Sequence, residues 1–312
     1  MTFSPAFKAP KAIESRICGG GRGTQNTQRL GILMICLASL IFAVQDAVGR
    51  HLASAYPAIF LVMLRYWFFA LFAVALVARS PGGLAAAIGT PHKVKQVIRG
   101  LLLAANVTVM LIAFVRMGIV ETHAVFTVAP LLVVALSGPV LGERVGWRRW
   151  TAIAIGFAGI LVILQPGLRV LSPWAALPVV GALLFAGYAL LTRQLSSDDG
   201  ALVNFFWAGV AGAAGVTALG LWFAQPIARA DWPWVACLCL TGAGGHYALI
   251  RAYELAEASS LQPFSYTQLV WVSLIGFFVL GERVAPHVVI GMAIVVAAGL
   301  FTWWQAERQP PR

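Results

Sequence analysis

The chain has 312 residues, of which 60% are hydrophobic and 11% are charged. A soluble globular domain has about 45–50% apolar and about 25% charged residues, so the composition excludes that class. The formal net charge of +11 would suit nucleic-acid binding in a soluble protein, but basic residues in so apolar a chain anchor the cytoplasmic ends of spanning helices. We therefore expect an all-α membrane protein in contact with the lipid bilayer and no nucleic-acid partner.

Residues 1–29 combine a run of glycines with scattered Lys and Arg, which indicates a disordered cytoplasmic tail. Ten apolar stretches follow, each bounded by charge, Pro or Gly and each near the length of about 20 residues that crosses a bilayer. They cover residues 30–48, 57–77, 97–115, 122–141, 147–164, 174–191, 201–224, 232–253, 258–280 and 286–304. Residues 306–312 then form a second short cytoplasmic tail.

Basic residues are distributed unevenly between the predicted loops. With the N-terminus in the cytoplasm, 16 of the 22 Lys and Arg fall on the cytoplasmic side and five on the opposite side, while Arg65 lies within a span. The positive-inside rule then predicts a multi-pass protein of the cell inner membrane with both termini in the cytoplasm.

Two segments of the sequence are repeated. The sequence Leu-Gly-Glu-Arg-Val at 141–145 recurs at 280–284, and Leu-Ile-Phe-Ala at 40–43 is echoed by Leu-Leu-Phe-Ala at 183–186. These echoes predict two five-helix units, residues 30–165 and 172–305. Because five crossings reverse the chain, the second unit should be inserted in the opposite sense, as in the inverted repeats of many secondary transporters.

The residues around the first copy of the repeated turn resemble the EamA family of the drug/metabolite transporter superfamily. That family has a span with a proline in mid-helix, a Leu-Gly-Glu-Arg type turn and a glycine-rich span, which here are Pro130, residues 141–144, and Gly156 with Gly159. Arg65 matches an arginine that the family carries early in its second span. The resemblance covers nearly the whole chain.

The second half departs from this pattern. It keeps the turn, but Leu269 stands where Pro130 would align, and its own proline, Pro263, comes earlier.

The resemblance implies a secondary transporter that works by alternating access and is not an enzyme. Family habit favours an exporter, and we expect its solute to be an amino-acid-like compound or an amino-acid-derived metallophore. Import of a vitamin or of an S-adenosylmethionine-type cofactor is the alternative. A membrane-embedded enzyme acting on lipid-linked substrates, and a sensor or assembly protein, stay open as other classes.

Two charged residues fall inside the first two predicted spans. Asp46 lies near the outer end of the first span and Arg65 about two turns into the second, so an antiparallel hairpin would bring them to similar depth. Charges inside a membrane are usually partnered. We predict that they form an ion pair that locks the hairpin, or a gate. The second repeat has Ala189 at the position of Asp46.

The most polar intramembrane stretch lies in the eighth and ninth spans. Pro263 frees a backbone carbonyl that lipid cannot satisfy, so this stretch should face protein or a wet cavity. The first half carries a matching polar group on its third and fourth spans. We predict a central substrate-binding cavity lined by Asn106, His123, His246, Tyr247, Gln262, Tyr266 and Gln268. The alternative for each residue is a simple hydrogen bond between helices.

His246 titrates nearest to neutral pH within the second-half group and could make protons the coupling ion, although an interhelical hydrogen bond is the simpler role. We expect no catalytic residue, no metal site and no cofactor. The four cysteines have no metal-like spacing to histidine, and the sequence has no P-loop pattern. A small-molecule solute is the expected partner, and a homodimer stays open.

Overall fold

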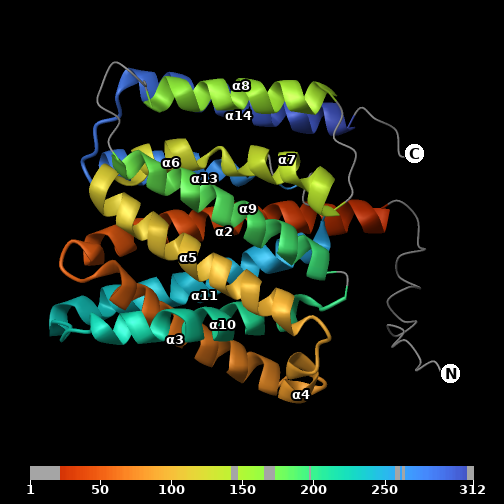
Figure 1. Ribbon diagram of the computed structural model, residues 1–312, viewed down its shortest axis with the longest axis vertical. Helices are drawn as coiled ribbons and strands as arrows, with labels where there is room; N and C mark the ends of the chain where they lie inside the picture. Colours follow the sequence, from red (N-terminus) through yellow and green to blue (C-terminus); the bar gives the residue numbers. More distant parts are fainter. Residues whose placement is uncertain are drawn as a thin grey trace.

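A computed structural model describes residues 22–141, 147–164, 173–196, 198–256, 261 and 264–307. In these ranges the chain forms a bundle of helices whose axes run in broadly the same direction (Figure 1). In chain order the elements are α2 (Arg22–Ala53), α3 (Ala58–Ala78), α4 (Gly83–Ile88), α5 (Lys93–Met117), α6 (Ile119–Phe126), α7 (Ala129–Leu141), α8 (Trp147–Leu164), η1 (Pro173–Ala175), α9 (Ala176–Leu195), α10 (Ala201–Trp222), η2 (Arg229–Asp231), α11 (Trp232–Leu255), α13 (Thr267–Phe278) and α14 (Pro286–Glu307).

Seven helical segments in the described part of the chain are long and apolar enough to cross a membrane, with α6 and α7 together counted as one. Three shorter apolar helices, Ile153–Ile163, Thr267–Phe278 and Pro286–Ala298, lie where the sequence predicted the remaining spans. The ninth predicted span, 258–280, includes residues outside the described ranges, and its helix α13 covers 12 residues.

The structure differs from the predicted spans and tails at three notable places. Helix α2 begins at Arg22, so residues 22–29, which we predicted as part of a disordered tail, are helical. A short helix, α4, lies between the second and third spans, where we predicted none. The fourth predicted span, 122–141, is divided, because α6 ends at Phe126 and α7 begins at Ala129. Pro130 accounts for the division, since its ring has no N–H and collides with the carbonyl four residues earlier, which belongs to Phe126.

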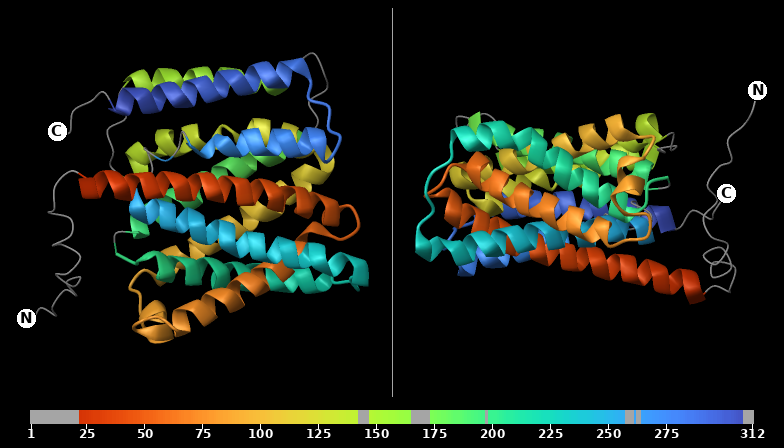
Figure 2. Two further views of the ribbon diagram at one scale, coloured as in Figure 1. Left: turned by 180° about the vertical axis from the view of Figure 1, so that it is seen from behind. Right: turned by 90° about the horizontal axis from the view of Figure 1, so that it is seen from below.

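Helices of the two halves of the chain pack against each other reciprocally. Helix α2 packs along α11 and α5 along α9, while α3 packs on α10 and α8 on α14. In the predicted repeat α9 corresponds to α2 and α11 corresponds to α5. The contact between α2 and α11 therefore has its counterpart in the contact between α9 and α5. The pair α8 and α14 lies at one edge of the bundle in Figure 1 and in the left-hand view of Figure 2. This reciprocity is what an internal repeat produces.

Glycines bring α10 close to α3. A Cβ atom at Gly212 would lie 2.1 Å from Cε1 of Tyr66, and one at Gly209 would lie 3.2 Å from the backbone of Ala70. A side chain at either position would push the helices apart. Glycine in this helix therefore permits close packing against α3.

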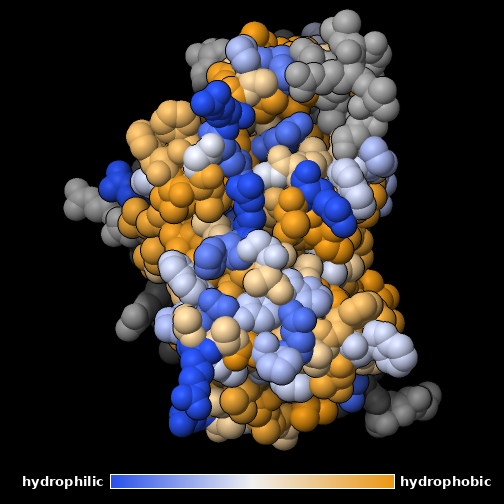
Figure 3. All heavy atoms as spheres, turned by 90° about the vertical axis from the view of Figure 1, so that its left-hand side faces the viewer, coloured by the Kyte–Doolittle hydropathy of each residue, from blue (hydrophilic) through white to orange (hydrophobic). Residues whose placement is uncertain are grey.

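Figure 3 shows the end where α2 connects to α3 and α13 to α14, with hydrophilic residues gathered across the middle of the face and hydrophobic residues around them. The first turn of α2 and the last turn of α14 both lie at the opposite end (Figure 1).

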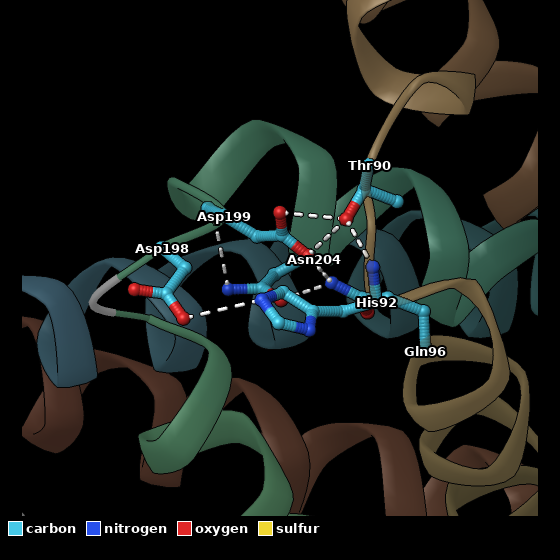
Figure 4. A network of polar contacts seen from close by, with 6 residues as sticks. All are labelled: Thr90, His92, Gln96, Asp198, Asp199 and Asn204. Carbon is cyan, nitrogen blue, oxygen red and sulfur yellow. Dashed lines mark hydrogen bonds and ion pairs between the residues drawn. The ribbon is translucent and has the colours of Figure 1, made fainter. Parts of the chain in front are cut away.

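At that opposite end, a buried carboxylate joins the two halves (Figure 4). Asp199, just before α10, accepts hydrogen bonds from Oγ1 of Thr90 at 2.7 Å and from Nε2 of Gln96 at 2.8 Å. Gln96 also donates to Oδ1 of Asn204 at 2.8 Å. Beside this network His92 pairs with the more exposed Asp198 at 3.2 Å.

The network continues inward through Arg99, which is completely buried. Its guanidinium donates to Gln96, to Thr192 and to the carbonyl oxygen of Asn204, and it lies 5.5 Å from the ring centre of Tyr188. A buried guanidinium needs such acceptors, because an unpaired charge in a membrane interior is costly. Helices α5, α9 and α10 are thereby held together at this end.

Candidate functional site

A cavity lies between the two halves of the chain. Helices α2, α3, α5, α6, α11 and α13 supply most of its walls, and Phe185 adds α9. Its polar wall residues are Ser39, Gln45, Asp46, Arg65, Asn106, His123, His246, Tyr253, Ser265 and Gln268. Its aromatic rings are Phe42, Phe114, Phe126 and Phe185. Such a mixture of apolar walls and few polar groups is typical of small-molecule sites.

On one wall, Arg65 of α3 contacts His246 of α11. Each is 4% exposed, and Nη2 of Arg65 lies 2.9 Å from Nε2 of His246. A guanidinium can only donate, so Nε2 must accept, and the imidazole is neutral with its proton on Nδ1. The ring centroid of Phe42 lies 4.9 Å from that of the imidazole, and the ring of Phe69 stacks on the imidazole with centroids 5.7 Å apart.

Three buried polar atoms of the cavity's wall residues lack a hydrogen-bond partner within the described ranges. They are Nε of Arg65, Nδ1 of His246 and Oε1 of Gln45. Most buried polar groups in proteins are paired, and an unpaired one costs roughly 1–3 kcal/mol. This wall therefore contains two donors and one acceptor that no described residue satisfies.

On another wall, Asp46 of α2 contacts His123 of α6. Oδ2 of Asp46 lies 2.8 Å from Nε2 of His123, and it accepts a longer hydrogen bond, 3.3 Å, from Nε2 of Gln268 on α13. The ring of Phe114 stacks on the imidazole with centroids 5.2 Å apart. The contact joins both halves of the chain, because α13 belongs to the second.

The predicted ion pair between Asp46 and Arg65 is not formed among the described residues, so this prediction is wrong. Each charged side chain instead contacts a histidine on a different helix. The reason is the packing of α2, which lies along α11 and α13 and touches α3 far less. A hairpin argument assumes that sequential helices are the closest neighbours, and here they are not.

The other predicted residues lie in different places. Asn106 lines the cavity and donates from Nδ2 to the carbonyl oxygen of Gly181 at 2.8 Å, so it also makes the interhelical bond that was the alternative. Tyr247 is 37% exposed and its ring contacts Phe205 outside the cavity lining. Tyr266 is buried and does not contribute to that lining. Gln262 lies outside the described residues.

Sequence reasoning missed Gln45 and the aromatic walls. The signal for Gln45 was available, since it is a polar residue beside Asp46 within a span. The phenylalanines carried no such signal, because an apolar ring in a spanning helix looks the same whether it faces lipid or a cavity.

The repeated turn closes one end of the bundle beyond the cavity. The carboxylate of Glu282 accepts hydrogen bonds from the backbone N–H groups of Ile119 at 2.9 Å and Val120 at 3.0 Å, and it pairs with Arg50. A carboxylate at a helix N-terminus is favourable, because the free N–H groups and the helix dipole attract negative charge. Glu282 thus ties α6 and α2 to the α13–α14 connection. The first copy of the turn, 142–145, lies outside the described residues.

Gly118 allows this approach. Its φ of 91° is in the left-handed region that L side chains rarely adopt, and a Cβ atom there would lie 3.0 Å from Oε1 of Glu282. Beside it a polar pocket is lined by Arg116, Glu121, Arg283 and His287 among others.

Comparison with known proteins shows relatives along nearly the full chain. The riboflavin transporter of Rhizobium johnstonii is 30% identical over 291 residues, which cover 90% of this chain and 94% of that protein. The S-adenosylmethionine uptake transporter of Rickettsia prowazekii is 23% identical, with 89% and 94% covered. The pseudopaline exporter CntI of Pseudomonas aeruginosa is 22% identical, with 86% and 94% covered.

A chain of known crystal structure shares the fold, with a TM-score of 0.66 and 18% sequence identity over 91% of this chain and 98% of that one. The model of the EamA-like transporter family matches residues 29–165 and again residues 172–304. The predicted resemblance is confirmed, and so is the prediction that the chain is no enzyme. The chain belongs to the EamA-like transporter family and is a multi-pass membrane transporter of small molecules.

Proposed function

We propose that this protein takes up a vitamin of the riboflavin class through the central cavity. The observation that carries the proposal is the composition of that cavity, in which aromatic rings surround unpaired polar atoms of Gln45, Arg65 and His246. A flavin has a broad aromatic ring system that stacks on such rings and one polar edge with two carbonyl groups and an N–H between them. Two donors and one acceptor on the wall complement that edge.

Uptake takes the place of the export that we expected from the sequence. Support comes from the relatives, because riboflavin and S-adenosylmethionine uptake transporters match this chain at higher identity or coverage than the pseudopaline exporter does. Export of an amino-acid-like compound or metallophore has correspondingly weaker support.

Uptake of an S-adenosylmethionine-type cofactor is the second candidate. Its sulfonium cation would be attracted by aromatic faces and by the carboxylate of Asp46, which lines the same cavity. The buried cation of Arg65 opposes it, because two positive charges in one low-dielectric cavity repel each other.

We also propose the topology within which this site works. Ten crossings would form two inverted units, residues 30–165 and 172–305, between tails at 1–29 and 306–312. This topology is supported by the reciprocal packing of the two halves. It is also supported by the first turn of α2 and the last turn of α14, which lie at the same end of the bundle. Both termini would then lie in the cytoplasm of an inner-membrane protein, with the Glu282 end outside, so that alternating access opens the cavity to each side in turn.

The test is uptake by cells that require riboflavin and lack their own riboflavin transporter. Expression of this chain should restore growth on low external riboflavin and accumulation of labelled riboflavin. Arg65→Gln should abolish most of the gain, whereas Arg79→Gln, at the other end of α3, should not. Failure of the inserted wild-type protein to accumulate riboflavin would refute the proposal, and accumulation of labelled S-adenosylmethionine instead would establish the second candidate.

A further inference from the structure

The cavity contains an acid that the solute site does not need. Asp46 is the one carboxylate among the described residues that line it, and its side chain is 12% exposed. The second half of the chain has Ala189 at the matching position, 2% exposed in the packed interior. The fold therefore builds the same helix without an acid, and Asp46 must be explained by something other than architecture.

The partners of Asp46 allow the site to gain or lose one proton. His123 holds Nε2 at 2.8 Å from the carboxylate, and Gln268 donates at 3.3 Å. With a neutral imidazole the pair has a charge of −1, and one added proton makes it neutral whether that proton is assigned to the carboxylate or to the imidazole. A net charge in a membrane interior is costly unless another charge compensates it.

Few of the described residues that line the cavity around the pair are charged or titratable. Helix α3 contributes Arg65 and helix α11 contributes His246 and Tyr253, all three in the same cavity. From α5 and α13 the facing polar groups, Asn106 and Gln268, do not titrate. Because the contact with Arg65 keeps His246 neutral, the positive charge of Arg65 is what compensates the unprotonated pair.

His123 also connects the pair to the closed end of the bundle. Helix α6 starts at Ile119, whose N–H donates to Glu282, and His123 lies one turn further along the same short helix. A proton that changes the contact between His123 and Asp46 therefore acts on the helix whose start is held by Glu282. This gives a physical route from proton binding to opening of that end.

We propose that Asp46 and His123 form a proton-binding site that couples solute uptake to the proton gradient. One proton from the outer side binds to the pair when the cavity faces outward, and the same proton leaves to the cytoplasm when the cavity faces inward. No bond to the solute forms or breaks. The inference rests on the proposed function for its solute but assigns the proton to this pair and not to His246.

The experiment uses the purified full chain in liposomes and labelled riboflavin. Accumulation driven by an imposed pH gradient measures coupling, while counterflow at equal pH measures carrier function alone. Wild type should show both, and a pH dye should report one proton entering with each solute. In Asp46→Asn and His123→Gln the ratio of gradient-driven accumulation to counterflow should fall at least tenfold, whatever change each substitution makes in counterflow itself. His92→Gln and Asp198→Asn, a histidine–aspartate pair at the bundle's end, should keep both.

A second readout does not depend on the solute. Infrared difference spectra between acidic and alkaline buffer should contain a band that depends on Asp46, either the carbonyl band of a protonated carboxyl group or a band of the protonated imidazole. This band should be missing in Asp46→Asn and present in Asp198→Asn. Gradient-driven accumulation in Asp46→Asn at the wild-type level, or a band unchanged by that substitution, would overturn the proton site. If the wild-type protein shows counterflow but no response to the pH gradient, proton coupling is refuted while riboflavin uptake stands. If riboflavin counterflow is absent but the Asp46 band is present, only the identity of the solute is refuted.

Discussion

Nη2 of Arg65 lies 2.9 Å from Nε2 of His246, and this contact joins helix α3 of the first family match to α11 of the second. Neither side chain forms an ion pair with a carboxylate in the described part of the chain. The positive charge of Arg65 thus faces a solute cavity with a neutral histidine as its partner.

Arg65→Lys tests this arrangement. A lysine keeps the charge but loses the planar guanidinium that can contact His246 and the solute together, so these side chains are not interchangeable here. We expect the KM for riboflavin to rise about tenfold, which is about 1.4 kcal/mol of binding free energy. Initial uptake rates over a range of riboflavin concentrations measure it. An unchanged KM would show that the guanidinium does not contact the solute.

Glu282→Gln should loosen the end of the bundle that the repeated turn closes. The substitution removes the ion pair with Arg50 and weakens the cap on α6. Hydrogen bonds to charged groups contribute about 1.5–3 kcal/mol. The fraction of molecules in which this end of the bundle is open should therefore rise at least fivefold. The measurement is the labelling rate of Ser39→Cys, in a background without other cysteines, by a membrane-impermeant maleimide from outside. Glu254→Gln, which breaks an exposed pair with Arg251, is the control and should leave the rate unchanged. Equal rates in both variants would contradict a gate at Glu282.

Asp199→Ala should destabilise the protein, whereas Asp198→Ala should not. Asp199 is 6% exposed and accepts from Thr90 and Gln96, while the side chain of Asp198 is 58% exposed. Loss of a buried acceptor leaves two donors unpaired, at a cost of roughly 1–3 kcal/mol each. The midpoint of thermal unfolding in detergent should fall by several degrees for the first variant and by about one degree or less for the second. Similar midpoints would mean that water replaces the carboxylate at this end.

Tyr56 offers a prediction about pH, because it lies in the connection between α2 and α3. Its hydroxyl donates to Oδ2 of Asp231 at 2.6 Å, and this hydrogen bond raises the pKa of Tyr56 above its ordinary value of 10.0. Only the neutral phenol can donate, so the stabilisation is fully present below pH 10 and is lost as the pH rises through the raised pKa. The ultraviolet difference titration of wild type minus Tyr56→Phe should show ionisation above pH 10. Asp231→Asn should move that step down, and a step at or below pH 10 in the wild type would contradict the hydrogen bond.

Much of the fold could be predicted from the sequence, because long apolar stretches and a repeated turn are properties of the chain itself. The run at 201–224 became α10 (Ala201–Trp222) almost residue for residue. The position of the break after Phe126 could not be read in the same way, although Pro130 was recognised, because a proline in a spanning helix can either kink it or divide it.

The candidate site was harder to predict, because it depends on how each helix is rotated. His246 and Tyr247 are neighbours in sequence, but successive side chains of a helix point about 100° apart. His246 therefore meets Arg65 in the cavity, while Tyr247 lies against Phe205 with more than a third of its surface exposed. Which helix a side chain meets is decided by packing between distant segments, and no local pattern encodes it.

The most direct measurement is a structure of the protein determined with riboflavin bound. We predict density for the ring system in the cavity between α2, α3 and α11, stacked near Phe42 and with its polar edge toward Arg65 and His246. Density for riboflavin at any other place in the molecule, with this cavity filled by side chains, would contradict it.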